Sequence, residues 1–157
     1  MERLSDPSTN QSFGVVTFNQ AQQSLIYNLL DQRRYQYPKL ERHFSNTFEP
    51  VFIKNLENVQ GDERDVILFS IGFGPDESGK YRLEFGPLNK RGGERRLNVA
   101  VSRARQQMWI FSSILPEQIE LNRTNARGAK DLRAFLDYAR RGIEALERPQ
   151  QQGEMQG

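Results

Sequence analysis

The chain has 157 residues, which is long enough for one domain with a substantial core. Its 22 basic and 20 acidic residues nearly cancel, so net charge alone does not indicate nucleic acid, and the absence of cysteine excludes disulfides and thiolate metal sites. No apolar run is long enough to span a membrane and no signal-peptide pattern is present, so we expect a cytoplasmic protein without a membrane partner.

Residues 1–12 are polar and predict a flexible lead to the first element. Residues 13–18 form a β-rich apolar run that predicts a buried strand. Asn19 then suits the N-cap of a helix that continues to about Tyr37. The inner face of this helix is expected to carry Leu25, Ile26 and Leu29. A strand followed directly by a helix is half of a βαβ unit, in which ligands bind at the carboxyl ends of the strands.

Two further short apolar runs, residues 52–55 and 66–71, predict the next strands. The polar loop 56–65 joins them and contains Gly61, which allows a tight turn or a close backbone approach to a ligand. Four carboxylates could form a magnesium site here: Glu57, Asp62, Glu63 and Asp65. Their spacing favours a simple connecting loop, and the single His43 has no second ligand type at metal spacing, so we predict no metal ligands.

Residues 74–80 match the G-x-x-x-x-G-K spacing of a phosphate-binding P-loop, but three features oppose that function. Tyr81 replaces the Ser or Thr that would hold Mg²⁺, and two acidic side chains inside the loop would repel phosphate. The alternation of residues 81–85 predicts a strand rather than a helix. We therefore expect a hairpin or strand pair over residues 66–85, and no ATP cradle in this chain.

Residues 95–105 follow a basic loop and read as a helix that can press closely on a sheet. Its apolar stripe consists of Leu97, Ala100, Val101 and Ala104. Arg96 and Arg103 lie seven positions apart and share a basic face, and planar guanidinium groups suit phosphate because they donate bidentately. On periodicity alone, a surface helix with solvated arginines is an equal alternative.

Residues 107–113 predict another buried strand, with Trp109 in the core rather than on a stacking surface. An amphipathic helix is expected over about residues 125–146, followed by a polar tail over residues 147–157. Strands that alternate with helices through short loops imply a three-layer α/β/α sandwich with a mainly parallel sheet over residues 13–146.

The stretch 95–105, Arg-Arg-Leu-Asn-Val-Ala-Val-Ser-Arg-Ala-Arg, closely resembles motif VI of superfamily 1 helicases, in the branch of the nonsense-mediated-decay helicases. There the arginine of Thr/Ser-Arg-Ala is an arginine finger on the γ-phosphate of ATP. The resemblance therefore implies that Arg103 is catalytic, and we assign Arg96 to the nucleotide as well.

The loop 56–65 resembles motif V of the same family, Gln-Gly-x-Glu-x-Asp. The matching residues are Gln60, Gly61, Glu63 and Asp65. The resemblance implies that Glu63 contacts the nucleotide ribose and that the Gln-Gly turn links the nucleotide to the nucleic acid. Asn55 stands where relatives carry a Ser or Thr that touches phosphate, and an amide can donate the same bond.

Residues 14–22 resemble motif IV: Thr17 and Gln22 match, whereas Phe18 and Asn19 replace the usual Pro-Tyr. From motifs IV and V we expect four residues to contact nucleic acid, namely Thr17, Asn19, Asn55 and Asn58.

The three motifs follow the family's order, and the resemblance covers roughly residues 13–143, which implies the second RecA-like domain of an ATP-dependent helicase. The resemblance further suggests a fragment of a large bacterial helicase with an appended endonuclease-like domain. ATP and Mg²⁺ would be shared with an upstream RecA-like domain of the same protein, and this chain alone would be inactive. The partner would be single-stranded or duplex nucleic acid, with DNA favoured over RNA.

Two alternatives remain open at this point. One is a nucleic-acid-binding or interaction module without ATP coupling. The other is a nuclease domain, which needs a constellation of carboxylates and lysine such as Glu57, Asp65 and Lys54.

Overall fold

The computed structural model describes residues 10–45, 47–74, 77–79, 81 and 84–146, so the predicted tail and most of the predicted lead lie outside the described residues. Its sheet has four parallel strands in the order β2-β1-β3-β4. The strands are β1 (Phe13–Thr17), β2 (Phe52–Asn55), β3 (Arg64–Ile71) and β4 (Ala104–Ser112). The α-helices are α2 (Gln20–Gln36), α3 (Gly93–Val101) and α4 (Arg127–Arg141).

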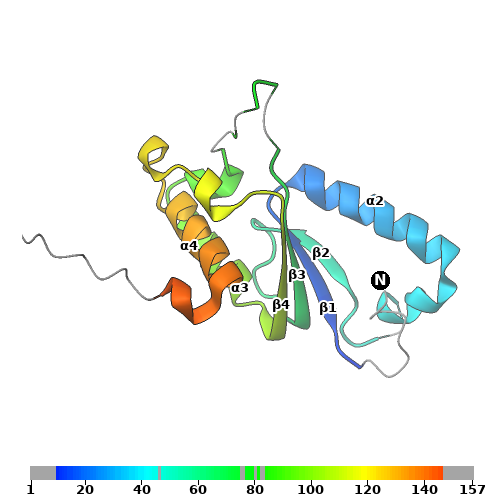
Figure 1. Cartoon of the computed structure of the whole chain (residues 1–157). Helices are drawn as coiled ribbons and strands as arrows, with labels where there is room; N and C mark the ends of the chain where they lie inside the picture. Colours follow the sequence, from blue (N-terminus) through cyan, green and yellow to red (C-terminus); the bar gives the residue numbers. More distant parts are fainter. Residues whose placement is uncertain (1–9, 46, 75–76, 80, 82–83, 147–157) are drawn as a thin grey trace, which may run out of the picture.

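Helices cover the two faces of the sheet unequally, with α2 on one side and α3 and α4 on the other (Figure 1). Within the described ranges, five short 3₁₀ helices lie between or after these elements: Pro38–His43, Gly86–Asn89, Pro116–Gln118, Leu121–Arg123 and Gly142–Ala145. The predicted three-layer α/β/α, RecA-like architecture is confirmed. Within the described residues, no helix has the length and apolar character needed to cross a membrane.

The larger core lies between the sheet and the pair α3 and α4. It joins Phe69 of β3 to Leu97 of α3 and Leu132 of α4, all of them buried. Leu56 and Val59, from the loop after β2, are buried in the same core. The connection from β2 to β3 therefore crosses this face of the sheet without a helix of its own.

Helix α2 begins as predicted, because the Asn19 side chain caps it by accepting from the backbone N–H of Gln22 at 2.9 Å. The prediction of its inner face is right only for Ile26, which is partly buried. Leu25 and Leu29 are 59% and 52% exposed, and the helix instead reaches the sheet through polar groups such as Gln23, which donates to the carbonyl of Ile53 at 2.8 Å. Periodicity could not distinguish a face that packs on the sheet from an apolar flank beside it.

The predicted helix over residues 95–105 is too long, since α3 ends at Val101. The backbone N–H of Arg103 donates to Ala100 three residues earlier at 3.2 Å, which tightens the last turn, and Ala104 already pairs with Arg64 of β3. Strand pairing thus overrides the helical pattern, and Arg103 lies in the turn between α3 and β4.

The prediction that Trp109 lies in the core was also wrong. Trp109 is 39% exposed and Phe111 is 55% exposed, because β4 is an edge strand whose face on the α2 side is not covered by that helix. In the predicted strand pair, Tyr81 forms an isolated bridge and Phe85 lies in no strand, while other residues of that segment and of the loop 74–80 lie outside the described residues.

Candidate functional site

Because all four strands run parallel, the sheet has an amino end and a carboxyl end. The loop 56–63 begins at the carboxyl end of β2 and finishes at the amino end of β3. It therefore separates the candidate residues into two groups. Glu63 and Arg103 lie at the amino end, immediately before β3 and β4. The residues predicted to contact nucleic acid lie at the carboxyl end.

A backbone hydrogen bond holds the two candidate nucleotide residues of the amino end next to one another. The N–H of Arg64 donates to the carbonyl of Arg103 at 3.1 Å, and Glu63 directly precedes Arg64. The guanidinium of Arg103 folds back over the last turn of α3, where Nε donates to the carbonyl of Val99 at 2.9 Å and Nη2 donates to Ser102 Oγ at 3.0 Å. A cation is favourable at this helix end because the helix dipole is negative there.

Arg96 lies in the first turn of α3, at the other end of the loop from Glu63. Its Nη1 donates to Glu57 Oε1 at 3.2 Å, and both side chains are about half exposed. Since Glu57 follows the carboxyl end of β2, Arg96 lies nearer to the residues predicted to contact nucleic acid than its assignment to the nucleotide suggested. Helix α3 and the loop 56–63 thus run together from one end of the sheet to the other.

The Gln60-Gly61 turn is exposed, and Gly61 has a φ of +90°, which L side chains rarely adopt. A Cβ at Gly61 would meet nothing within 4 Å, so the position requires glycine for its conformation and not for space. The ion pair between Lys54 and Asp62 joins the following residue of the loop to β2.

Arg105 was not predicted as part of a cluster, yet it binds several groups at the amino end. Its Nη1 donates to Glu49 Oε1 at 2.8 Å, its Nε donates to Asp65 Oδ1 at 3.0 Å, and its Nη2 donates to Ser12 Oγ at 3.1 Å. Glu63 lies further away, with Oε1 at 3.7 Å from Nη1. The signal available in the sequence was the opposite charge of Asp65 and Arg105, each the second residue of a strand.

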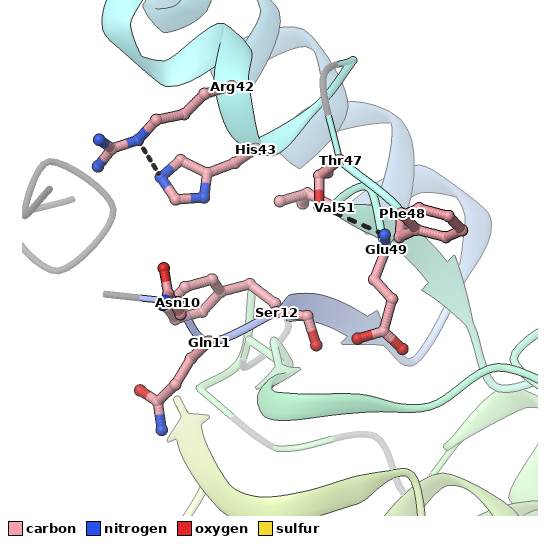
Figure 2. Close-up of a pocket in the computed structure, with 10 residues that line it drawn as sticks. Asn10, Gln11, Ser12, Arg42, His43, Thr47, Phe48, Glu49 and Val51 are labelled. Carbon is pink, nitrogen blue, oxygen red and sulfur yellow. Dashed lines mark hydrogen bonds between the residues drawn. The ribbon is translucent and has the colours of Figure 1, made fainter. Parts of the chain in front are cut away.

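These contacts shift the pKa values of the charged groups in the cluster. The pKa of the Asp65 carboxyl is lowered, first by the backbone N–H of Ser12 and then by Arg105, although burial acts in the opposite direction. Arg105 likewise lowers the pKa of Glu49 and has its own pKa raised by the two carboxylates. Figure 2 shows Ser12 and Glu49 on the wall of a pocket of about 320 Å³ beside this cluster.

At the carboxyl end, two of the four residues predicted to contact nucleic acid are buried. Thr17 donates to the carbonyl of Asn19 at 3.1 Å. Asn55 Nδ2 donates to the side chains of Gln20 and Gln23 at 3.1 and 2.9 Å. Both side chains therefore position the start of α2 and are not exposed to a ligand.

Asn19 and Asn58 are exposed at the same end. Each uses its side-chain oxygen within the chain: Asn19 caps α2, and Asn58 Oδ1 accepts from the backbone N–H of Asn55 at 2.8 Å. Within the part of the chain that the structure describes, the Nδ2 groups of these two residues donate to no other atom. Both amides can therefore donate outward.

The residues of the nuclease alternative do not converge. Glu57 pairs with Arg96, Asp65 with Arg105 and Lys54 with Asp62, so each belongs to a different ion pair. Among the described residues, no group of three His, Cys, Asp or Glu side chains could hold a metal ion.

Comparison with known proteins identifies the family. The AAA domain family matches residues 1–114. The chain is 40% identical over 131 residues to the uncharacterized ATP-dependent helicase MG140 of Mycoplasma genitalium, and the match covers 82% of this chain and 11% of that protein. It is 37% identical over 142 residues to the homolog in Mycoplasma pneumoniae, covering 88% of this chain and 12% of that protein.

The chain therefore spans only a small part of either relative. The family match covers most of the chain and includes the motif IV, V and VI segments. The parallel sheet with helices on both faces agrees with it. The chain belongs to the AAA domain family and is a helicase domain of the superfamily 1 type.

Proposed function

We propose that the chain is the second RecA-like domain of a cytoplasmic, ATP-dependent nucleic-acid helicase, with Arg103 as its arginine finger. The observation that carries this proposal is the bond from Arg64 N–H to the Arg103 carbonyl, which keeps Glu63 and Arg103 together. A carboxylate accepts from ribose hydroxyls and a guanidinium donates to phosphate, so one nucleotide could engage both residues. The two relatives named as ATP-dependent helicases support the same function.

Arg103 reaches a phosphate only when its side chain turns away from α3. Its present partners, Val99 and Ser102, lie on its own turn of the chain, so the change needs one side-chain rotation and no change of fold. Charge that develops on the γ-phosphate then interacts with the guanidinium fork. An arginine finger of this kind contributes about 10³–10⁵ to the rate.

The nucleotide would lie between this chain and an upstream RecA-like domain of the same polypeptide. We assign the P-loop, the Mg²⁺ ligands and the catalytic carboxylate to that domain, because the carboxylates of the loop 56–65 pair with cations of this chain. ATP is then the shared substrate. The isolated chain should hydrolyse ATP no faster than background.

At the carboxyl end, we assign the direct nucleic-acid contacts to Asn19 and Asn58. Thr17 and Asn55 then act by positioning the elements around them. The loop 56–63 joins Asn58 to Glu63, and α3 accompanies it through the Arg96–Glu57 pair. A shift of this loop when nucleotide binds would therefore reach the carboxyl end of the sheet, where the nucleic acid is proposed to bind. We expect that nucleic acid to be DNA in preference to RNA.

The ribose assignment is tested with Glu63→Ala in the longer polypeptide that contains this chain. A ribose contact is the same in the ground state and the transition state, so the KM for ATP should rise while kcat is retained. Glu144→Ala is the matched control, since that carboxylate is exposed in the 3₁₀ helix Gly142–Ala145, outside motifs IV, V and VI, and its loss should leave the KM unchanged. An unchanged KM in Glu63→Ala, or rapid ATP turnover by the isolated chain, contradicts the proposal.

A further inference from the structure

The starts of α3 and α4 meet near the carboxyl end of the sheet, on the face that both helices cover (Figure 1). The 3₁₀ helix Gly86–Asn89 lies between them. A Cβ built at Gly93 of α3 would meet the carbonyl oxygen of Leu88 at 2.6 Å, and one built at Gly128 of α4 would meet the same oxygen at 2.4 Å. The backbones therefore touch, so the segment that precedes α3 and the first turn of α4 form one surface.

This surface concentrates positive charge. Residues 86–92, which precede α3, contain two basic and no acidic side chains, and residues 127–131 of α4 contain two basic and one acidic. Their combined formal net charge is +3, compared with +2 for the whole chain. The next two residues, Glu94 and Arg95, have opposite charges and leave this excess unchanged. We name the four exposed basic side chains the basic patch, which consists of Lys90, Arg91, Arg127 and Lys130.

The cations of the basic patch are poorly compensated within the chain. Among the described residues, the side chains of Lys90, Arg91 and Lys130 have no acidic partner. Arg127 has only a long pair with Asp131, at 3.7 Å between Nε and Oδ2. Arginines elsewhere, such as Arg105 and Arg141, are paired with carboxylates. Uncompensated positive charge that gathers on one exposed surface attracts an external anion.

The composition of the surface favours nucleic acid over a protein as that anion. Its apolar side chains Pro87, Leu88 and Ala129 are all buried, whereas interfaces between proteins contain an apolar core inside a polar rim. The two segments contain no aromatic residue on which a base could stack. Lys and Arg side chains that contact phosphates need neither feature, because such contacts carry no sequence information.

We propose that the basic patch binds the phosphate backbone of single-stranded nucleic acid, beyond the contact at Asn58. This inference rests on the proposed function, in which the nucleic acid lies at the carboxyl end of the sheet. The patch continues that site, because the Arg96–Glu57 pair holds the first turn of α3 beside the loop that contains Asn58. The strand therefore crosses from this loop over the start of α3 to the start of α4.

The salt dependence of binding tests the basic patch in the longer polypeptide that contains this chain. Labelled oligothymidylate is titrated by fluorescence anisotropy without ATP, at several salt concentrations, against the wild type and the double variant Lys90→Gln with Arg91→Gln. The loss of two phosphate contacts should reduce the slope of log Kd against log salt by about 1.4, since each contributes about 0.7 for a single strand. At low salt the Kd should rise about tenfold.

Arg33→Gln with Lys39→Gln is the matched control, because it removes the same charge from exposed positions near the amino end of the sheet. It should leave the slope unchanged. Lys90→Arg with Arg91→Lys keeps both charges and should bind like the wild type. If Lys90→Gln with Arg91→Gln has the same slope as the control, the inference is overturned.

Acetylation of lysines, followed by mass spectrometry, distinguishes nucleic acid from a protein occupant. In the longer polypeptide alone, Lys90 and Lys130 should react as readily as Lys39, which is also exposed. Oligothymidylate should lower the reactivity of Lys90 and Lys130 several-fold and leave Lys39 unchanged. Protection of the two patch lysines before oligothymidylate is added would show that another part of the polypeptide covers the basic patch, and would overturn the inference.

Failure of this inference differs from failure of the proposed function. If the wild type binds oligothymidylate and Asn58→Asp weakens that binding, a double variant of Lys90 and Arg91 that behaves like the control places the basic patch outside the path of the strand. The proposed function then stands. A wild type that does not bind oligothymidylate contradicts both.

Discussion

Arg105 donates through Nε to Asp65 Oδ1 at 3.0 Å, and this bond joins β4 to β3 at their amino ends. The same guanidinium also binds Glu49 and Ser12. Arg105 therefore has a structural role two residues after the proposed finger. The Arg103 side chain, in contrast, donates to Val99 and Ser102 on its own turn of the chain.

The Asp65 carboxyl should make the stability of the domain sensitive to acid. Its pKa is lowered in the folded state, so its contribution is complete above the unfolded-state pKa of about 3.9 and is lost as the pH falls through the folded-state value. Asp65→Asn should therefore be less stable than the wild type near neutral pH, and the difference should shrink in acid. Urea unfolding midpoints from about pH 7 to about pH 3 measure this.

The control for this prediction is Arg105→Ala, which removes the cation and keeps the carboxyl. It should reduce the same pH dependence in part, because the Ser12 N–H is the larger cause of the shift and remains. A difference between Asp65→Asn and the wild type that stays constant across the pH range would contradict the assignment.

Gly61→Ala should destabilise the chain through its backbone conformation alone. An L residue at a φ of +90° is strained by about 1–2 kcal/mol, which corresponds to a few degrees in melting temperature. Gly74→Ala is the matched control, because that position also has nothing within 4 Å and does not have a positive φ. Equal melting temperatures for the two variants would show that the turn relaxes without cost.

The sequence predicted the order of elements well, because strand and helix runs were strongly patterned. It placed β1, β2 and the N-cap of α2 within a residue or two of their positions. It failed at Val101, where the helical pattern continued but the pairing of Ala104 with β3 ended the helix. That pairing joins residues distant in the sequence, so a local pattern could not show it.

The candidate site shows the same limit. Motif resemblance selected Glu63 and Arg103, which the fold holds close together. It also grouped Thr17 and Asn55 with exposed residues, although both are buried. The ends of parallel strands contain polar side chains that bind ligands and polar side chains that hold the elements together. Burial distinguishes them, and burial depends on the whole fold.

Asn58→Asp should weaken nucleic-acid binding and leave the fold intact. The aspartate keeps an oxygen that can accept from the N–H of Asn55, but it replaces an outward amide donor with a negative charge. The affinity of the longer polypeptide for a single strand should fall about tenfold, equivalent to about 1.4 kcal/mol. Fluorescence anisotropy at fixed salt measures the Kd, because phosphate contacts depend strongly on ionic strength.

Asn28→Asp adds the same charge on an exposed position of α2 and is the matched control. It should change the affinity little. If both variants weaken binding equally, the effect is a general one of charge, and Asn58 has no direct contact.

Arg103→Lys separates the guanidinium fork from its charge. Lysine keeps the positive charge but cannot donate bidentately, so it should restore little of the activity that Arg103→Ala loses. Both variants should keep the wild-type melting temperature, because the Arg103 side chain is partly exposed and lies outside the core formed by α3. Arg95→Ala, at an exposed position of α3, is the control.

The most direct test of the proposed function is the kcat for ATP of Arg103→Ala in the longer polypeptide, at saturating ATP and single-stranded nucleic acid. We predict a fall of about 10³-fold or more, since the lost interaction forms on the charge that develops in the transition state. Arg95→Ala should retain kcat under the same conditions. A wild-type kcat in Arg103→Ala would contradict the assignment of the arginine finger.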